Sequence, residues 1–173
     1  MDNYYLGYKV ALHLIEKGHI KIGFIGQSDI SSNVTDRMMG IQKALNEHNS
    51  SLKKEWIIEN HDPKSGLYTL DFNLPDEMPT AFICHCDRAA YFLMEKLKSQ
   101  NISVPGKISI LSFDDTEVAQ QTTPPLTSFK IDRNMFAVEA IKLMEKKQEN
   151  SLSTPERIYL SAELIERESV QAI

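Results

Sequence analysis

Two adjacent carboxylates, Asp114 and Asp115, stand at the end of an apolar, β-branched run that covers residues 108–113. A polar loop follows them, and a second short apolar run begins after Pro124-Pro125. This pattern predicts two buried strands, with both acids just beyond the carboxyl end of the first. In an open α/β sheet, ligands bind outside the carboxyl ends of the strands. The two acids therefore predict a small-molecule site.

Arg37 is the candidate partner of Asp114 in that site. It falls in the first turn of a predicted helix, after the loop that follows an earlier strand. A guanidinium presents a rigid fork of donors, and a carboxylate accepts from hydroxyls through charge-assisted bonds. An arginine and an aspartate that converge from strand ends suit a polyol such as a sugar. The residues alone also allow two other interpretations. Arg37 could be a solvent-exposed helix residue, and Asp114 could cap a helix that begins at Thr116.

The other clusters of reactive residues fit catalysis and metal binding poorly. Alternation along a strand points His85 away from the sulfurs of Cys84 and Cys86, and there is no second cysteine pair, so we expect no metal. No histidine and acid pair is recognisable beside Cys86 to make it a nucleophile. Gly23 and Gly26 lack the third glycine of a dinucleotide-binding loop. We therefore expect neither an enzyme nor a cofactor.

The composition predicts a single globular domain that does not bind DNA by itself. The chain has 173 residues, of which 42% are hydrophobic, enough for a sizeable core and too many for a disordered chain. It carries 19 Lys and Arg against 24 Asp and Glu, for a net charge of −5, without a basic cluster. Nucleic-acid affinity depends largely on basic groups that neutralise phosphates. If the protein works on DNA, another segment must contact it.

The location predicted from the sequence is the cytoplasm. No apolar run approaches the length of a membrane span, so we expect no contact with a membrane. The first twenty residues do not have the arrangement of a secretory signal. Cys84 and Cys86 are too close together on a predicted strand to close a useful disulfide, which indicates a reducing compartment.

Strand-like and helix-like periods alternate along the chain. This order predicts an α/β fold, a three-layer sandwich with a mainly parallel sheet covered by helices on both faces. The predicted strands are 20–25, 56–58, 80–86, 107–113, 126–131 and an alternating final run from 158 to 164. The predicted helices are 4–17, 33–48, 87–99 and 134–147, with Asp87 as the cap of the third.

Two helices look unusual for an isolated domain. The chain opens directly on the first, with no strand before it. The helix at 134–147 is apolar on most sides, and such a helix needs partners on several sides. Both features predict that the chain is a piece of a larger protein.

Several stretches carry motifs of one known family, in that family's order. The first is DNYYLGYKVALHLIEKGHIKIGFIG at 2–26, with a helix, a Gly-His pair and a strand ending in glycine. An arginine-plus-glycine helix start, Asp36-Arg37 with Gly40, comes next. The later stretches are PTAFICHCD at 79–87, VPGKISILSFDD at 104–115, PPLTSFKID at 124–132 and LIERESV at 164–170. Together they resemble the lactose-repressor (LacI/GalR) family of transcriptional regulators.

The resemblance covers roughly the C-terminal half of such a regulator. It implies a single effector-binding lobe over residues 1–173, with a periplasmic-binding-protein-like type I fold. The helices at 2–18 and 132–148 would then belong to the otherwise missing N-terminal lobe. A small effector, expected to be a sugar, would bind between the lobes and change their angle. Operator DNA would be contacted only through a missing N-terminal helix-turn-helix, and the lobe would be non-catalytic.

The resemblance also places the site residues. It implies that Arg37 and Asp114 line the effector cleft, together with Asn33, His61 and Cys86. His61 matches a position often held by an aromatic residue that stacks on a sugar ring, although it could be a surface turn histidine. Asn33 could be only a helix cap. Cys86 departs from the family, where many members place a polar residue such as asparagine, and could be only a small buried residue.

A homodimer is the remaining implication of the resemblance. Its contacts would come from residues 88–97, including Tyr91 and Met94, and from residues 118–125, including Val118 and Thr122. Ordinary core packing is the other interpretation of Tyr91 and Met94. The alternative to a repressor is a periplasmic-type sugar-binding receptor, which shares the two-lobed core and would differ in its N-terminus.

Overall fold

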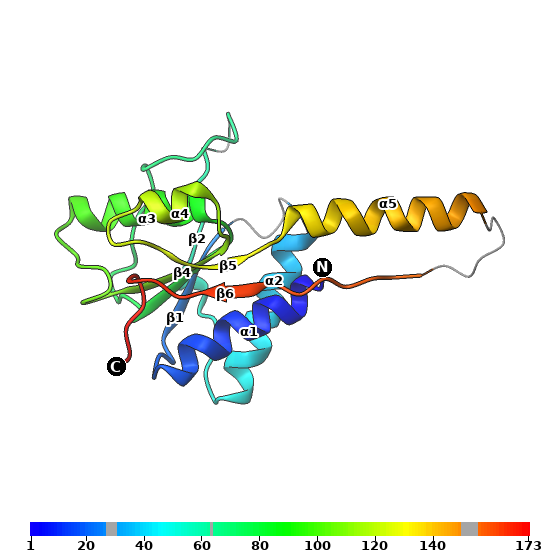
Figure 1. Ribbon diagram of the computed structural model, residues 1–173. Coiled ribbons are helices and arrows are strands. Elements are labelled where there is room, and N and C mark those ends of the chain that lie inside the picture. Colours follow the sequence, from blue (N-terminus) through cyan, green and yellow to red (C-terminus); the bar gives the residue numbers. More distant parts are fainter. Residues whose placement is uncertain (27–30, 63, 150–155) are drawn as a thin grey trace.

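A six-stranded sheet forms the centre of the molecule (Figure 1). The computed structural model describes residues 1–26, 31–62, 64–149 and 156–173. The strand order is β2-β1-β3-β4-β5-β6, and all neighbours are parallel except β5 and β6. The strands are β1 (Ile22–Ile25), β2 (Ile57–Ile58), β3 (Ala81–Cys84), β4 (Ser109–Asp114), β5 (Thr127–Lys130) and β6 (Glu163–Ile165). The predicted α/β fold with a mainly parallel sheet is confirmed.

Helices cover both faces of this sheet, which confirms the three layers. The helices α1 (Asn3–Glu16) and α2 (Ser32–Glu47) lie on one face, and α3 (Asp87–Ser99) and α4 (Glu117–Gln121) lie on the other (Figure 1). A short 3₁₀ turn, η1 (Lys54–Trp56), leads into β2. Side chains alternate along each strand, so Ile83 packs with α1 and α2 whereas Phe82 and Cys84 pack with α3. The sheet therefore separates two apolar cores.

The first helix is part of this lobe, and the expectation that residues 2–18 belong to a missing one is wrong. Its apolar side chains Leu6, Val10 and Leu14 are buried in the core under α2 and the sheet. The two helices touch at glycines: a Cβ on Gly7 would lie 2.0 Å from the Arg37 carbonyl oxygen, and one on Gly40 would lie 1.9 Å from that of Tyr4. Because these contacts are between backbones, α1 and α2 form one packed unit.

The helix α5 (Arg133–Glu149) has a different environment. It projects from the end of β5 away from the three layers (Figure 1). Its apolar side chains at every third position are exposed, namely Met135, Val138, Ile141 and Met144. The return segment before β6 was predicted to be a strand from residue 158, but in the structure only Glu163–Ile165 pair, with β5. The alternating pattern does not make residues 158–162 a strand, because β5 ends at Lys130 and offers them no partner to pair with.

Two helix starts also differ from the prediction. The side chain that caps α2 is Ser31, which accepts from the Val34 N–H, rather than Asn33. The N-cap position of α3 is Cys86, and Asp87 is the first residue inside the helix. Among the described helices, none combines the length and the apolarity that a membrane span needs.

Candidate functional site

Arg37 and Asp114 converge at the carboxyl edge of the sheet, as predicted. The guanidinium Nη2 lies 3.9 Å from the Asp114 Oδ1, and the guanidinium stacks 4.4 Å from the centre of the Phe113 ring. Arg37 is only 7% exposed, so it is not the solvated helix residue that the sequence also allowed. Burial lowers the pKa of Arg37 and the nearby Asp114 opposes this, but a guanidinium keeps its charge in proteins.

The orientation of Arg37 is fixed by two hydrogen bonds within the protein. Its Nε donates to the Asn3 Oδ1 over 3.1 Å, and its Nη1 donates to the His85 carbonyl oxygen over 2.7 Å. Asn3 in turn donates from Nδ2 to the Asn33 Oδ1 over 3.0 Å. Asn33 therefore steadies the residue that holds Arg37. With two donors engaged by the protein, the Nη2 side of the fork faces Asp114.

The backbone at Asp114 is strained. Its φ is +98°, in a region that costs a residue with a side chain about 1–3 kcal/mol. Burial raises the pKa of the Asp114 carboxyl, and the positive charge of Arg37 opposes that rise. The carboxylate is 26% exposed and lines a cavity of about 590 Å³. A strained, partly exposed carboxylate beside a buried guanidinium is suited to accept hydrogen bonds from a ligand.

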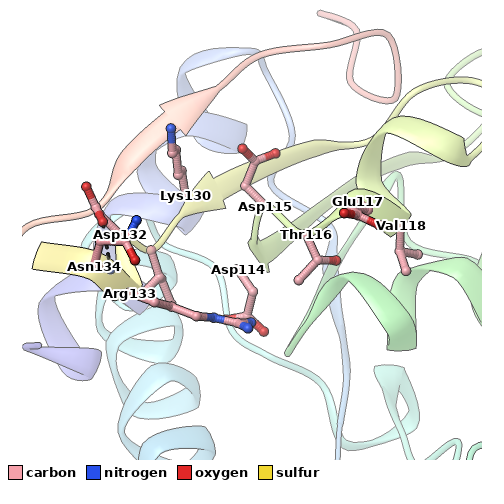
Figure 2. A pocket seen from close by; sticks show the side chains of 10 residues that line it. Asp114, Asp115, Thr116, Glu117, Val118, Lys130, Asp132, Arg133 and Asn134 are labelled. Carbon is pink, nitrogen blue, oxygen red and sulfur yellow. Dashed lines mark hydrogen bonds between the residues drawn. The ribbon is translucent and has the colours of Figure 1, made fainter. Parts of the chain in front are cut away.

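The cavity continues from Asp114 along the ends of β4 and β5. Figure 2 shows the side chain of Arg133, at the start of α5, extending toward Asp114. The cavity is also lined by Asp115, Thr116, Glu117, Val118, Lys130, Ile131, Asp132 and Asn134. Of the five predicted ligand residues, only Asp114 lines this cavity; the other four lie farther along the same edge of the sheet.

The two adjacent acids have different roles. Asp115 pairs with Arg167, whose Nη2 lies 2.7 Å from the Asp115 Oδ1. Its backbone N–H donates to the Ser128 Oγ over 3.1 Å. The Asp115 side chain is 9% exposed, so it ties the segment after β6 to the sheet. The Asp115 carboxylate is therefore already engaged by Arg167, whereas Asp114 is the freer of the two acids that line the cavity.

A third acid, Asp87, holds the segment that presents Asp114. Its Oδ1 accepts from the hydroxyls of Ser112 and Ser128 over 2.6 and 2.7 Å. Its Oδ2 accepts from the Thr116 N–H over 2.6 Å and from the Thr116 hydroxyl over 2.8 Å. Asp87 is 1% exposed and lies at the N-terminus of α3, where the helix dipole favours an anion. It is a buried structural centre and not the helix cap that the sequence suggested.

His61 and Cys86 meet in a cluster of aromatic and sulfur-containing side chains. The His61 ring centre lies 4.2 Å from that of Tyr68 and 5.7 Å from that of His85. The Tyr68 hydroxyl lies 3.0 Å from the Cys86 Sγ and 3.3 Å from the His85 Nε2. Burial lowers the pKa of His85 to about 4 and raises the pKa of the Cys86 thiol. Both groups are therefore neutral near pH 7.

All five predicted ligand residues thus lie along one edge of the sheet, joined through residues that the sequence did not single out. These missed residues are Asn3 and Tyr68, and His85, which the sequence singled out only to weigh a metal site, joins them. The prediction that His85 points away from both sulfurs is wrong for Cys86, because the His85 Nε2 lies 3.8 Å from that sulfur. Alternation fails there because residues 85 and 86 follow the last residue of β3.

The predicted dimer contacts have unequal exposure. Tyr91 is 41% exposed on α3, but Met94 is 5% exposed and packs within the core, as the alternative interpretation had it. Thr122 is also buried, and its hydroxyl donates to the Ala119 carbonyl oxygen. Val118 is partly exposed and lines the cavity of Figure 2. Met94 and Thr122 therefore offer little surface to a partner, whereas Tyr91 and Val118 are more accessible, and the dimer contact stays a prediction.

Comparison with known proteins identifies similar sequences. A family described as "Periplasmic binding protein-like domain" matches residues 11–170. The chain is 32% identical over 169 residues to the HTH-type transcriptional repressor PurR of Actinobacillus pleuropneumoniae, covering 95% of this chain and 50% of that protein. A repressor of the same name from Glaesserella parasuis is 32% identical over 173 residues, covering 95% and 51%. The chain spans about half the length of the curated relatives it matches.

Solved structures show the same fold. A transcriptional regulator LacI from Bacillus cereus subsp. cytotoxis superimposes with a TM-score of 0.84 at 27% identity, over 99% of this chain and 62% of that one. A sugar-binding transcriptional regulator of the LacI family from Escherichia coli, complexed with phosphate, superimposes with a TM-score of 0.82 at 26% identity, over 100% and 63%. The fold therefore agrees with that of these bacterial regulators.

Proposed function

Because this chain belongs to the periplasmic binding protein-like family, as an effector domain of the LacI/GalR type, we propose that it is the sensing lobe of a transcriptional repressor. The lobe binds a small polar effector and performs no reaction. The relatives named above are repressors of the helix-turn-helix type, which supports this function over that of a periplasmic receptor. We further propose that a helix-turn-helix outside this chain contacts operator DNA, which places the protein in the cytoplasm.

The observation that carries this proposal is the pair formed by Arg37 and Asp114. A buried, oriented guanidinium and a strained carboxylate lie 3.9 Å apart at the edge where α/β sheets bind ligands. Such a pair offers a donor and an acceptor to neighbouring hydroxyl groups. We propose Arg37, Asp114, Asn33, His61 and Cys86 as the ligand-binding residues, and a sugar as the effector. The sugar-binding regulator of similar fold supports that choice.

Thermal unfolding of the chain in the presence of candidate ligands tests the function. We expect one class among a panel of monosaccharides, disaccharides and nucleobases to raise the midpoint, because a ligand that binds only the folded state stabilises it. The same compound should change the binding of the complete protein to its operator DNA. If no compound stabilises the chain and the complete protein binds no DNA, the proposed function is wrong.

We propose that α5 packs against the other lobe of the complete protein, as predicted for residues 132–148. Replacing Val138 and Ile141 by glutamate should leave the unfolding free energy of this chain within about 0.5 kcal/mol, because both side chains are exposed here. In the complete protein the same changes should lower the free energy of unfolding, because they place two charges in an interface that the second lobe covers. Urea unfolding of both proteins compares the two effects. Equal effects in both would contradict a second lobe over α5.

We propose that the protein is a homodimer with Tyr91 on its contact surface. Tyr91 is exposed on α3, and a large amphipathic ring is typical of interface centres. Tyr91→Asp should therefore halve the mass that light scattering reports, since it buries a charge in the interface. The exposed Asp76→Lys on another surface is the matched control. A chain that is already monomeric at every concentration would rule out this contact.

A further inference from the structure

The direction of the Asp114 side chain depends on its backbone. Its carboxylate has one described ion-pair partner, the Arg37 Nη2 at 3.9 Å, and accepts no hydrogen bond from the described residues. The backbone φ is +98° at Asp114 and +47° at Asp115, so two successive residues with side chains stand in the left-handed region. Such a conformation persists only where surrounding contacts hold it. The contacts that hold this turn, residues 114–115, therefore decide where the Asp114 carboxylate points.

Arg167 holds the turn through the side chain of Asp115. Its Nη2 donates to the Asp115 Oδ1 over 2.7 Å, and its Nη1 donates to the Leu126 carbonyl oxygen over 2.7 Å. The Asp115 and Arg167 side chains are only 9% and 16% exposed, so solvent ions screen the pair little. A guanidinium that uses both arms of its fork fixes its partner in direction as well as in distance. The Asp115 carboxylate is thereby tied to the first residues of β5.

The C-terminal segment that carries Arg167 is anchored without the Arg167 side chain. The Arg167 N–H donates to the Thr127 Oγ1 over 2.9 Å. The Ser169 hydroxyl donates to the Ile110 carbonyl oxygen over 2.6 Å and accepts from the Thr127 N–H over 2.8 Å. These hydrogen bonds connect the segment to β4 and β5. A change of the Arg167 side chain alone should therefore loosen the turn while the segment stays in place.

We propose that Arg167 is a positioning residue for Asp114, because it holds the turn through Asp115 and so directs the Asp114 carboxylate toward the cavity and Arg37. Figure 2 shows the side chains of Asp114 and Asp115 extending in different directions, so a hold on one leaves the other open. Arg167 itself is not among the described residues that line the cavity. The inference rests on the proposed function in that Asp114 binds the effector, but the place of the carboxylate can be measured without an effector.

Titration of the Asp114 carboxyl carbon by ¹³C NMR in the chain itself tests the positioning. Burial raises the pKa of this carboxyl, and the positive charge of Arg37 opposes the rise. In Arg167→Leu the carboxylate loses its fixed place beside Arg37, so we expect its titration midpoint to rise by about 0.5 pH unit or more. Arg167→Lys keeps the positive charge but cannot bind Leu126 and Asp115 together as a fork, so the midpoint should rise by a similar amount.

Two variants on the same segment are matched controls. Ser169→Ala removes an anchor of the segment, and it should lower the free energy of unfolding while the Asp114 midpoint stays unchanged. Glu166→Gln breaks an exposed ion pair and should change neither quantity. An unchanged midpoint in both Arg167 variants would overturn the proposal. A rise in Arg167→Leu that is absent in Arg167→Lys would also overturn it, since charge alone would then explain the shift. Arg167→Lys decides the question by itself if Arg167→Leu does not fold.

Isothermal titration then connects the turn with sensing. The probe is the monosaccharide or disaccharide that raises the thermal unfolding midpoint of the unchanged chain. Arg167→Leu should bind this probe about tenfold more weakly or worse, because the charge-assisted acceptor is misdirected, whereas Ser169→Ala should keep its affinity. A probe that binds Arg167→Leu as tightly as the unchanged chain would overturn the role of Arg167 in sensing. If no saccharide binds the unchanged chain, the proposed sugar effector is wrong, and the NMR titration still decides whether Arg167 positions Asp114.

Discussion

Replacing Asp87 by alanine should lower the free energy of unfolding by about 3–5 kcal/mol. The carboxylate is buried and accepts four hydrogen bonds from Ser112, Ser128 and Thr116. Removing it leaves those donors without a partner in a region from which water is excluded, and each such group costs about 1–3 kcal/mol. A domain is usually stable by only about 5–15 kcal/mol, so this single change would remove a large part of its stability.

Urea unfolding followed by circular dichroism measures this loss. Asp87→Asn is a milder variant, because the amide oxygen still accepts from two hydroxyls while its NH₂ group cannot accept from the Thr116 N–H. We expect it to lose about 1–3 kcal/mol. The exposed Asp76→Ala is the matched control and should change stability by less than about 0.5 kcal/mol. A loss below about 1 kcal/mol in Asp87→Ala would mean that the four hydrogen bonds do not hold this part of the fold.

Asp87 also connects stability with the candidate site. It binds Thr116, two residues after Asp114, and Ser128 on the neighbouring strand β5. The strained backbone at Asp114 persists only because its surroundings hold it. A variant such as Asp87→Asn, if folded, should therefore bind an effector more weakly although Asp87 touches no ligand. Asp87 is in this sense a positioning residue.

Most of the sheet could be predicted from the sequence, because its strands are short apolar runs between turns. The runs that became β1, β3, β4 and β5 are buried from both faces, as parallel strands must be. The final run was predicted too long, since alternation does not show where the pairing strand ends. The sequence placed α1 in the missing lobe, because a helix that is apolar on one side can pack in either lobe. The close backbone contacts at Gly7 and Gly40 place it in this one.

The candidate site was predictable only in part. Arg37 and Asp114 are marked by their places at a helix start and a strand end. Tyr68 lies in an irregular segment with no local signal, and its contact with Cys86 joins residues that are 18 apart along the chain. Asp87 has the sequence signal of a cap, and its burial depends on serines that are 25 and 41 residues away along the chain. Such convergence is a property of the tertiary structure.

The second large effect concerns Asp114. Asp114→Asn should weaken effector binding roughly tenfold to a hundredfold, because it replaces a charge-assisted acceptor with a neutral amide. The fold should be retained, since the described contact of this carboxylate is an ion pair of 3.9 Å and asparagine tolerates a positive φ. Isothermal titration with the compound found by thermal unfolding measures the change.

Glu117→Gln is the matched control for this measurement, because Glu117 is an exposed acid that lines the same cavity. It should leave affinity unchanged, which would show that a specific carboxylate and not the overall negative charge is needed. The comparison also separates two roles of Arg37. If Asp114→Asn loses affinity while its stability is unchanged, the guanidinium and the carboxylate act together on the ligand. If affinity is unchanged in Asp114→Asn, the pair serves only to close the edge of the sheet, and the effector binds elsewhere.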